Sequence, residues 1–234
     1  MNADRRDLAS LLSRAECVLF DFDGPVCDLF GRHPADGVAR KIHKLLQESG
    51  LLPEGLYGSS DPHAMLRESA RGRSNTRIPE VLVQAERRVT EEELAAAGTA
   101  VPTPCADKLV AELVRLDKLI AVASNNSPDA VRLYLAKHGL ETWFDGKIFG
   151  RVADPALMKP HPDSLLRALD ALGVPSSLAL LVGDSASDVT AAHSAGVAFL
   201  GYAPNAEKYE ELLQAGVPVV TELSEVIGAL GSET

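Results

Sequence analysis

Residues 20–28, FDFDGPVCD, place two aspartates at the end of a short apolar run that begins at Cys17. A short apolar run of this kind is typical of a buried strand. Asp21 and Asp23 are close enough in the sequence to repel each other. Neighbouring carboxylates are unfavourable unless a cation or a shared proton offsets their charge. The stretch therefore predicts a buried first strand that ends at a site for a cation or a proton.

The rest of the chain predicts a parallel sheet around this strand. Short apolar runs bounded by turn residues follow at 119–125, 178–184, 197–202 and 218–220. Helical patterns lie between these runs, and several of them end in glycine, as helices often do. Strands that alternate with helices in this way predict an α/β fold whose parallel sheet is covered by helices on both faces.

Residues 30–98 interrupt the alternation of strands and helices. Three helical patterns occur there, ADGVARKIHKLLQESG, DPHAMLRESARG and PEVLVQAERRVTEEELAAAG, and no convincing strand separates them. Prolines in the segment that follows, GTAVPTP, mark the return to the sheet. We therefore expect a catalytic core made of residues 1–29 and 99–234, with residues 30–98 inserted as a helical cap.

Composition narrows the classes of partner. The 234 residues carry a formal net charge of −10, which argues against nucleic acid as a general partner. No apolar run approaches the roughly 18 residues that a membrane span needs, and the N-terminus lacks the apolar stretch of a signal peptide. The three cysteines show neither a disulfide framework nor a zinc spacing. We expect a cytoplasmic protein without membrane or nucleic-acid partners, either a monomer or a homodimer.

Polar side chains follow the ends of the expected strands. Ligands bind outside the carboxyl ends of the strands in open parallel sheets, so we expect these groups to converge. They would bring together four carboxylates, a hydroxyl group with an amide, and one ammonium group. The residues are Asp21, Asp23, Ser124, Asn125, Lys159, Asp184 and Asp188.

This set of groups is suited to phosphoryl transfer. Carboxylate oxygens with an incomplete shell suit Mg²⁺, which keeps water ligands and accepts phosphate oxygens. A cation, a lysine and hydroxyl or amide donors can stabilise charge on a transferring phosphoryl group. One carboxylate can attack phosphorus as a nucleophile, and a second can act as general acid and then as general base.

Four motifs in the chain, DFDGPV, VASNNS, MKPHPD and GDSASD, resemble those of the haloacid dehalogenase superfamily, and of its phosphatase branch in particular. They occur in the family's order, and the resemblance covers roughly residues 16–29 and 99–220. It implies a Rossmann-like parallel-sheet core with an inserted helical cap. It also implies Mg²⁺-dependent hydrolysis of a small phosphorylated metabolite through an aspartyl phosphate, as in phosphoglycolate phosphatases.

The resemblance assigns roles to individual residues. It makes Asp21 the nucleophile and Asp23 the general acid and base, with the backbone carbonyl of Asp23 on the metal. Dehalogenases of the family do not carry this second aspartate, so its presence favours phosphoester chemistry. Ser124 and Lys159 complete the catalytic set.

The same resemblance assigns two binding sets. The phosphate would be held by Ser124, Asn125 and Lys159. The metal would be held by Asp21, Asp23, Asp184 and Asp188, the last directly or through water.

Three alternatives stay open. The chain could be a sugar phosphomutase, or a pyrophosphatase or nucleotidase, of the same family. An alternative of another class is a regulatory protein that binds a phosphate ligand with little turnover. Pro25, which stands where the family usually has threonine, is the feature that supports this last alternative.

The cap holds further candidates for contact with substrate. Arg67, Arg71, Arg73 and Arg77 crowd one stretch, where one or two could grip a carboxylate or a second phosphate of the substrate. The simpler interpretation is a solvated face with ion pairs to glutamates such as Glu68. His33 and His63 could also meet the substrate, although single histidines more often play no such part. The three glutamates at 91–93 are predicted to form a solvated helix face.

Overall fold

A six-stranded parallel sheet forms the centre of the protein in the computed structural model, which describes residues 5–33, 35–72 and 78–231. The strand order is β5-β4-β1-β6-β7-β8, with β1 near the middle. The strands are β1 (Cys17–Phe20), β4 (Leu119–Ala123), β5 (Ile148–Phe149), β6 (Ala179–Gly183), β7 (Ala198–Tyr202) and β8 (Val219–Val220). The position of β1 between β4 and β6 places its carboxyl end at the centre of the sheet's edge.

Both faces of the sheet are buried, because alternate residues of each strand enter different hydrophobic clusters. Val18 and Phe20 pack in one cluster, while Cys17 and Leu19 pack in the other. The first face is covered by α1 (Arg5–Arg14), α5 (Ala106–Arg115), α6 (Pro128–Lys137) and α10 (Leu223–Leu230). The second is covered by α7 (Asp163–Leu172), α8 (Ala186–Ala195) and α9 (Ala206–Gln214). The predicted α/β fold with helices on both faces is confirmed.

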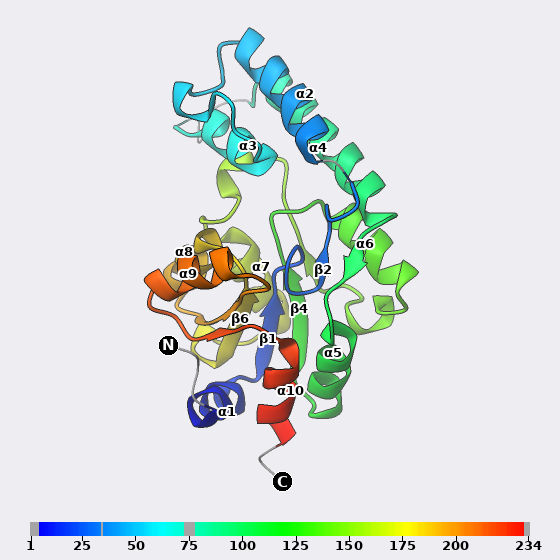
Figure 1. The fold of residues 1–234 in the computed structure, drawn as a ribbon, viewed down its shortest axis with the longest axis vertical. Coiled ribbons are helices and arrows are strands. Elements are labelled where there is room, and N and C mark those ends of the chain that lie inside the picture. Colours follow the sequence, from blue (N-terminus) through cyan, green and yellow to red (C-terminus); the bar gives the residue numbers. More distant parts are fainter. Residues whose placement is uncertain (1–4, 34, 73–77, 232–234) are drawn as a thin grey trace.

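The inserted segment forms a helical layer above the carboxyl edge of the sheet (Figure 1). Its helices are α2 (Ala35–Glu48), α3 (Pro62–Ala70) and α4 (Glu80–Ala97). They enclose a hydrophobic cluster of their own, which also receives Met158 from the core. The described part of residues 30–98 contains no strand, so the prediction of a helical cap is confirmed. The residue boundaries proposed for the two domains stay a prediction.

Several short elements were not predicted from the sequence. The strands β2 (Cys27–Asp28) and β3 (Val101–Pro102) pair antiparallel where the chain leaves and re-enters the core. The strand β5 is another two-residue element. Single-turn 3₁₀ helices occur at η1 (Glu54–Leu56), η2 (Glu141–Trp143), η3 (Pro155–Leu157) and η4 (Ser176–Leu178). Among the described helices, none has the length and apolar character needed to cross a membrane.

Candidate active site

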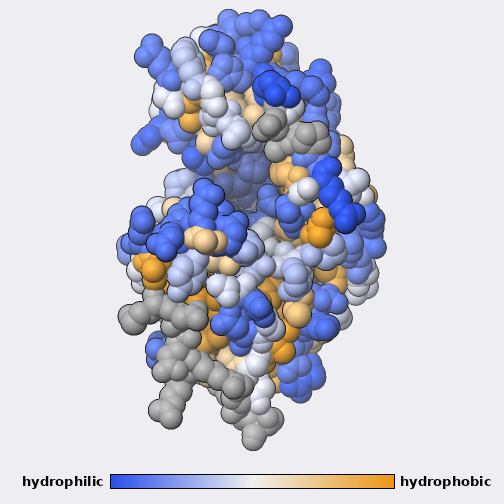
Figure 2. All heavy atoms as spheres, in the orientation of Figure 1, coloured by the Kyte–Doolittle hydropathy of each residue, from blue (hydrophilic) through white to orange (hydrophobic). Residues whose placement is uncertain are grey.

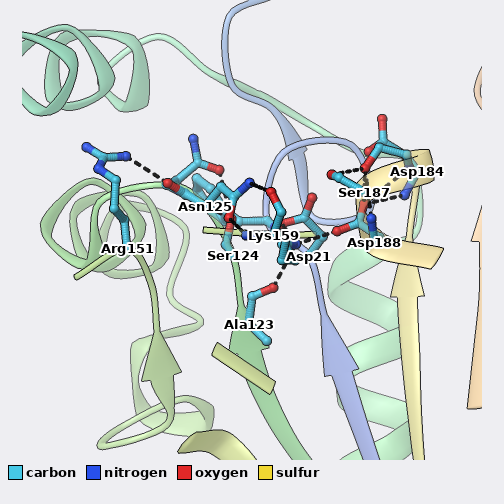
Figure 3. Close-up of polar contacts among 12 residues, drawn as sticks. Asp21, Ala123, Ser124, Asn125, Arg151, Lys159, Asp184, Ser187 and Asp188 are labelled. Carbon is cyan, nitrogen blue, oxygen red and sulfur yellow. Dashed lines mark hydrogen bonds and ion pairs between the residues drawn. The ribbon is translucent and has the colours of Figure 1, made fainter. Parts of the chain in front are cut away.

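The seven residues predicted from the sequence all line one cavity of about 240 Å³ at the carboxyl edge of the sheet. Asp21, Ser124 and Asp184 directly follow three neighbouring strands, β1, β4 and β6. Because these strands are parallel and in register, their ends lie at the same edge. Figure 3 shows the side chains converging there, and Figure 2 shows the hydrophilic hollow between cap and core.

Lys159 is the buried cation of this cavity, with only 1% of its side chain exposed. Its Nζ lies 2.9 Å from Oδ1 of Asp21, pairs with Oδ1 of Asp188, and donates to the carbonyl of Ala123 at 3.0 Å. Burial alone would lower the pKa of Lys159, but the carboxylates of Asp188 and Asp21 outweigh burial and raise it. The lysine is therefore a fixed positive charge between two carboxylates.

The backbone of Lys159 is tied to Asn125. The amide nitrogen of Lys159 donates to Oδ1 of Asn125 at 2.7 Å, and the carbonyl of Lys159 accepts from Nδ2 at 3.1 Å. These two bonds use both polar atoms of the Asn125 side chain. They hold the loop of Lys159 against the loop that follows β4.

Asp21 is a buried carboxylate with unusual electrostatics. Burial raises its pKa, the nearby Asp188 raises it further, and Lys159 opposes both effects. Its Oδ1 also accepts the amide hydrogen of Phe22 at 2.8 Å. The side chain is thus oriented by neighbours while it remains in the wall of the cavity.

Asp23 occupies a different environment two residues further on. Burial raises the pKa of Asp23 to about 6, although its Oδ1 accepts a hydrogen bond from the amide of Leu29 at 2.9 Å, which opposes the shift. A carboxyl group that titrates near neutral pH can both donate and accept a proton under ordinary conditions. Asp23 therefore has the properties that a general acid and base needs.

The turn after Asp23 explains why Pro25 is accommodated. The turn's backbone hydrogen bonds are donated by the amides of residues 24, 26 and 27. Proline at position 25 lacks an amide hydrogen, but it removes none of these bonds. Gly24 has φ +105°, and a Cβ there would lie 2.7 Å from Cγ of Asp184. The turn therefore packs directly against the second acidic motif.

Asp184 and Asp188 lie at the start of α8. Ser185 and Asp188 form a reciprocal capping box, which fixes Asp188 at the first turn of the helix. Burial and the charge of Asp21 raise the pKa of Asp184 to about 7. Lys208, which was not predicted as a site residue, lies on α9 with its Nζ 3.4 Å from Oδ2 of Asp184.

Three of the four predicted metal ligands come together. One carboxylate oxygen from each of Asp21, Asp184 and Asp188 lies within 4.8 Å of the other two. The carboxylate of Asp23 does not belong to this group; the role predicted for its backbone carbonyl stays a prediction. Burial, followed by the charge of a neighbouring aspartate, raises the pKa of Asp21 and of Asp184. A cluster of hard oxygen donors of this kind fits a divalent cation, which would offset the repulsion between the carboxylates.

The cap contributes residues to the same cavity. Asp61, His63 and Arg67 lie in its wall, so His63 and Arg67 do reach the site. Nη1 of Arg67 donates to the carbonyl of Lys159 at 3.1 Å, while its Nε pairs with Glu68. The exposed Arg71 pairs with Glu68 instead. Arg73 and Arg77 lie outside the described residues, and His33 bonds Glu92 away from the cavity.

The prediction of a solvated glutamate run at 91–93 is wrong for Glu93. Its carboxylate is fully buried and pairs with Arg151, whose side chain is also fully buried. The sequence did carry a signal for this burial. Glu93 follows Val89 by four residues and precedes Ala96 by three, which places it on the buried face of α4. Arg151 was not singled out from the sequence.

Comparison with known proteins agrees with this geometry. A family model for haloacid dehalogenase-like hydrolases matches residues 15–196, which include β1, the cap and the motifs through α8. The chain belongs to the haloacid dehalogenase-like hydrolase family. The resemblance predicted from its four motifs is thereby confirmed.

Curated relatives of this hydrolase are similar over part of their length. It is 33% identical over 124 residues to a phosphoglycolate phosphatase from Pectobacterium atrosepticum, covering 52% of each protein. It is 44% identical over 69 residues to a putative pyrophosphatase, PpaX, from Caldanaerobacter subterraneus, covering 28% of this chain and 31% of that protein. The chain thus spans about half or less of the curated relatives it matches.

Solved structures share the fold over nearly the whole chain. A predicted phosphatase from Clostridium acetobutylicum has a TM-score of 0.66 at 23% identity, covering 90% of this chain and 95% of that one. CbbY from Rhodobacter sphaeroides, solved with phosphate, has a TM-score of 0.64 at 22% identity, covering 93% and 99%. At this level of identity, the two structures establish the shared fold, cap included.

Proposed function

We propose that this hydrolase removes phosphate from small phosphomonoesters, with Mg²⁺ as cofactor and an aspartyl phosphate on Asp21 as intermediate. The observation that carries the proposal is the meeting of Asp21, Asp23 and Lys159 in one cavity at the sheet's edge. A nucleophile, a proton carrier and a fixed cation are then within one small space. Membership of the family and the phosphatases among the relatives support the same conclusion.

In the first step, a carboxylate oxygen of Asp21 attacks phosphorus and the bond from phosphorus to the leaving oxygen breaks. Asp23 gives its proton to that oxygen, so the product leaves as an alcohol. The raised pKa of Asp23, about 6, keeps a useful fraction protonated near neutral pH. After this step Asp23 is a carboxylate and can act as a base.

In the second step, Asp23 takes a proton from water as the water oxygen attacks phosphorus of the aspartyl phosphate. The bond between phosphorus and the Asp21 oxygen breaks, which releases inorganic phosphate and restores both carboxyl groups. Ser124, Asn125 and Lys159 hold the phosphoryl oxygens through both steps. Positive charge from Lys159 would stabilise the extra negative charge of the transition state.

The metal would be held by Asp21, Asp184 and Asp188, with the backbone carbonyl of Asp23. When bound, Mg²⁺ would supply positive charge to the phosphate oxygens and offset the repulsion among the carboxylates. The oxygen-only donor set supports this choice of cation.

The substrate is proposed to be a small phosphorylated metabolite, because the cavity is only about 240 Å³ in volume. Phosphoglycolate is the reference substrate, on the strength of the phosphoglycolate phosphatase relatives. Inorganic pyrophosphate is the second candidate, because the similarity to the putative pyrophosphatase reaches 44% identity.

The test is phosphate release from a panel of phosphomonoesters and pyrophosphate, with Mg²⁺ and with EDTA. Asp21→Asn removes the nucleophile at nearly constant size. Asp129→Asn makes the same change on α6, at an exposed aspartate that pairs with Arg132. We expect the wild type and Asp129→Asn to turn over substrate with Mg²⁺ but not with EDTA. Asp21→Asn should show no turnover in either condition.

The remaining alternatives predict other results in this assay. Isomerised sugar phosphate with little free phosphate would favour a mutase. Binding of phosphate without turnover of any ester would favour a regulatory protein. Full activity in EDTA would contradict the proposed cofactor.

A further inference from the structure

The buried carboxylate of Glu93 joins the cap to the loop that follows β4. Its Oε1 is bonded to Nε2 of His63 at 2.7 Å and accepts from Nδ2 of Asn126 at 3.1 Å. Its Oε2 accepts from the backbone amide of Ser127 at 2.9 Å. Two guanidinium nitrogens of Arg151 donate to the two oxygens, each at 3.0 Å. One side chain of α4 therefore contacts α3, the β4–α6 loop and the segment after β5.

The neighbours of Glu93 keep its carboxylate in the ionised form. Burial alone would raise the pKa of Glu93, but Arg151 and His63 outweigh it and lower the pKa to about 2. A buried ion pair stays intact only when its remaining hydrogen-bonding groups are also satisfied. Arg151 meets this condition through Glu86, Thr90 and the carbonyl of Asn125. All three guanidinium nitrogens of Arg151 therefore donate hydrogen bonds, and both carboxylate oxygens of Glu93 accept them.

Glu93 and Arg151 reach the proposed phosphate-binding residues without lining the cavity themselves. Asn126, held by Glu93, accepts a hydrogen bond on its Oδ1 from Oγ of Ser124 at 2.9 Å. Arg151 donates to the carbonyl of Asn125 at 2.7 Å, as Figure 3 shows. Neither Glu93 nor Arg151 belongs to the cavity wall. They therefore position Ser124 and Asn125 from outside the cavity wall.

His63 is the part of the network that faces the substrate. It lies in the cavity wall with 19% of its side chain exposed. An ionised carboxylate only accepts hydrogen bonds, so Nε2 of His63 carries the proton shared with Glu93. Among the described residues, Nδ1 has no hydrogen-bond partner. Nδ1 is therefore the ring atom left for a ligand. In the neutral ring it would accept a hydrogen bond from a hydroxyl group, and in the imidazolium form it would donate one to a carboxylate oxygen.

We propose that His63 is a substrate-binding residue that recognises a polar group on the leaving part of the phosphoester, and that Glu93 is the positioning residue that sets His63 and the Ser124–Asn126 loop relative to each other. The preferred substrates are then small phosphomonoesters whose leaving group carries a hydroxyl or carboxylate group. This inference rests on the proposed function for its substrate class. It adds a cap residue and a buried glutamate that the four sequence motifs do not contain.

The test compares His63→Ala and Glu93→Gln with the wild type on two kinds of ester. Phenyl phosphate has no polar group on its leaving part, whereas phosphoglycolate and glycerol phosphate have one. For His63→Ala we expect kcat/KM to fall about 10- to 100-fold on the polar esters, the loss of one good hydrogen bond. On phenyl phosphate, kcat/KM should stay within about twofold of the wild type. The inhibition constant of inorganic phosphate should also stay within about twofold.

Glu93→Gln should behave differently, because it disturbs the Ser124–Asn126 loop, which is proposed to hold the phosphate, as well as His63. We expect inhibition by inorganic phosphate to weaken about 10-fold and kcat to fall on every ester, phenyl phosphate included. The matched control is Glu92→Gln, the same change one residue earlier on α4, at a glutamate that pairs with Lys41 and His33 near the surface. It should leave every one of these constants unchanged. If Glu93 had only a structural role, Glu93→Gln would lower the melting temperature but leave inhibition by phosphate unchanged.

Failure of this inference can be told apart from failure of the proposed function. If the wild type turns over the esters but His63→Ala loses equally on polar and phenyl esters, His63 does not read the leaving group. If no ester is turned over, ligand binding can still test the role of His63. Melting-temperature shifts are then measured with phosphate and with phosphoglycolate on Asp21→Asn proteins with and without His63→Ala. His63→Ala should reduce the shift with phosphoglycolate and leave the shift with phosphate nearly unchanged. If the protein that keeps His63 shows no larger melting-temperature shift with phosphoglycolate than the His63→Ala variant does, the inference is overturned.

Discussion

The ammonium group of Lys159 lies 2.9 Å from Asp21 and also pairs with Asp188, so one buried cation joins the end of β1 to the first turn of α8. Lys159→Ala would leave both carboxylates buried without this cation. Removing one partner of a buried ion pair typically destabilises a protein by about 3–5 kcal/mol. We expect a loss of that order in urea unfolding with EDTA, together with loss of activity.

Mg²⁺ should restore part of the stability lost by Lys159→Ala, because a divalent cation can take over charge neutralisation. Lys208→Ala is the matched control, since Lys208 lies at the rim with 31% of its side chain exposed. It should cost far less stability. An equally large loss in the control, or a stable Lys159→Ala protein, would mean that the buried cation does not hold the site together.

Metal binding should raise the melting temperature of the wild type. A ligand at 100 times its dissociation constant stabilises by about 2.7 kcal/mol, so the shift should be plain in a thermal scan. Asp184→Asn removes one of three carboxylates in the cluster. We expect this variant to lose most of the Mg²⁺-dependent shift.

Without metal, the same Asp184→Asn substitution should not destabilise the protein at pH 8. Burial and Asp21 raise the pKa of Asp184 to about 7, so the folded state holds its proton more tightly than the unfolded chain does. The stability that Asp184 contributes to the metal-free protein is therefore lost as pH rises from about 4 to about 7. The asparagine variant lacks this loss, and a lower melting temperature than wild type in EDTA would contradict the argument.

Most of the site was predictable from the sequence because it is built from strand ends. The apolar runs that form β1, β4 and β6 are bounded by polar residues, and neighbouring parallel strands bring those residues to one edge. The backbone alone thus dictates that Asp21, Ser124 and Asp184 meet. Conversely, β2, β3 and β5 have two residues each, too few for a periodic pattern to be seen. The strand β8 is as short, but the apolar run at 218–220 marked it.

The contacts between cap and core were not predictable in the same way. His63 and Glu93 meet only because α3 and α4 pack in the cap, and Glu93 and Arg151 meet only because α4 also packs against the core. These are tertiary relationships between segments far apart in the sequence. The local pattern placed Glu93 on the buried face of its helix, but it named no partner for the charge.

Gly24 is predicted to tolerate no side chain, for reasons of both conformation and space. Its φ of +105° lies in a region that other residues adopt at a cost of roughly 1–2 kcal/mol. A Cβ would also meet the carboxyl group of Asp184 at 2.7 Å. Gly24→Ala should therefore displace Asp184, abolish most activity and weaken the Mg²⁺-dependent rise in melting temperature.

Gly173→Ala is the control for this substitution. Gly173 ends α7 with φ +67° and has open space where a Cβ would lie. It should show a similar conformational cost in unfolding experiments with normal activity and metal response. If both variants kept full activity, close packing of the turn against Asp184 would not matter for the site.

The acid sensitivity of the protein should depend in part on Glu93. Burial is outweighed by Arg151 and His63, which lower the pKa of Glu93 to about 2 from an ordinary value of 4.5. A lowered pKa in the folded state stabilises the protein above pH 4.5, and this contribution is lost as pH falls toward about 2. Each pKa unit corresponds to about 1.4 kcal/mol, so the contribution at neutral pH is about 3 kcal/mol. Glu93→Gln should therefore be less stable than Glu92→Gln at pH 7 by roughly this amount, and the difference should shrink steadily in urea titrations between pH 4.5 and pH 2.5. A difference that stays constant over that range would show that the ionised form of Glu93 is not what stabilises the junction of cap and core.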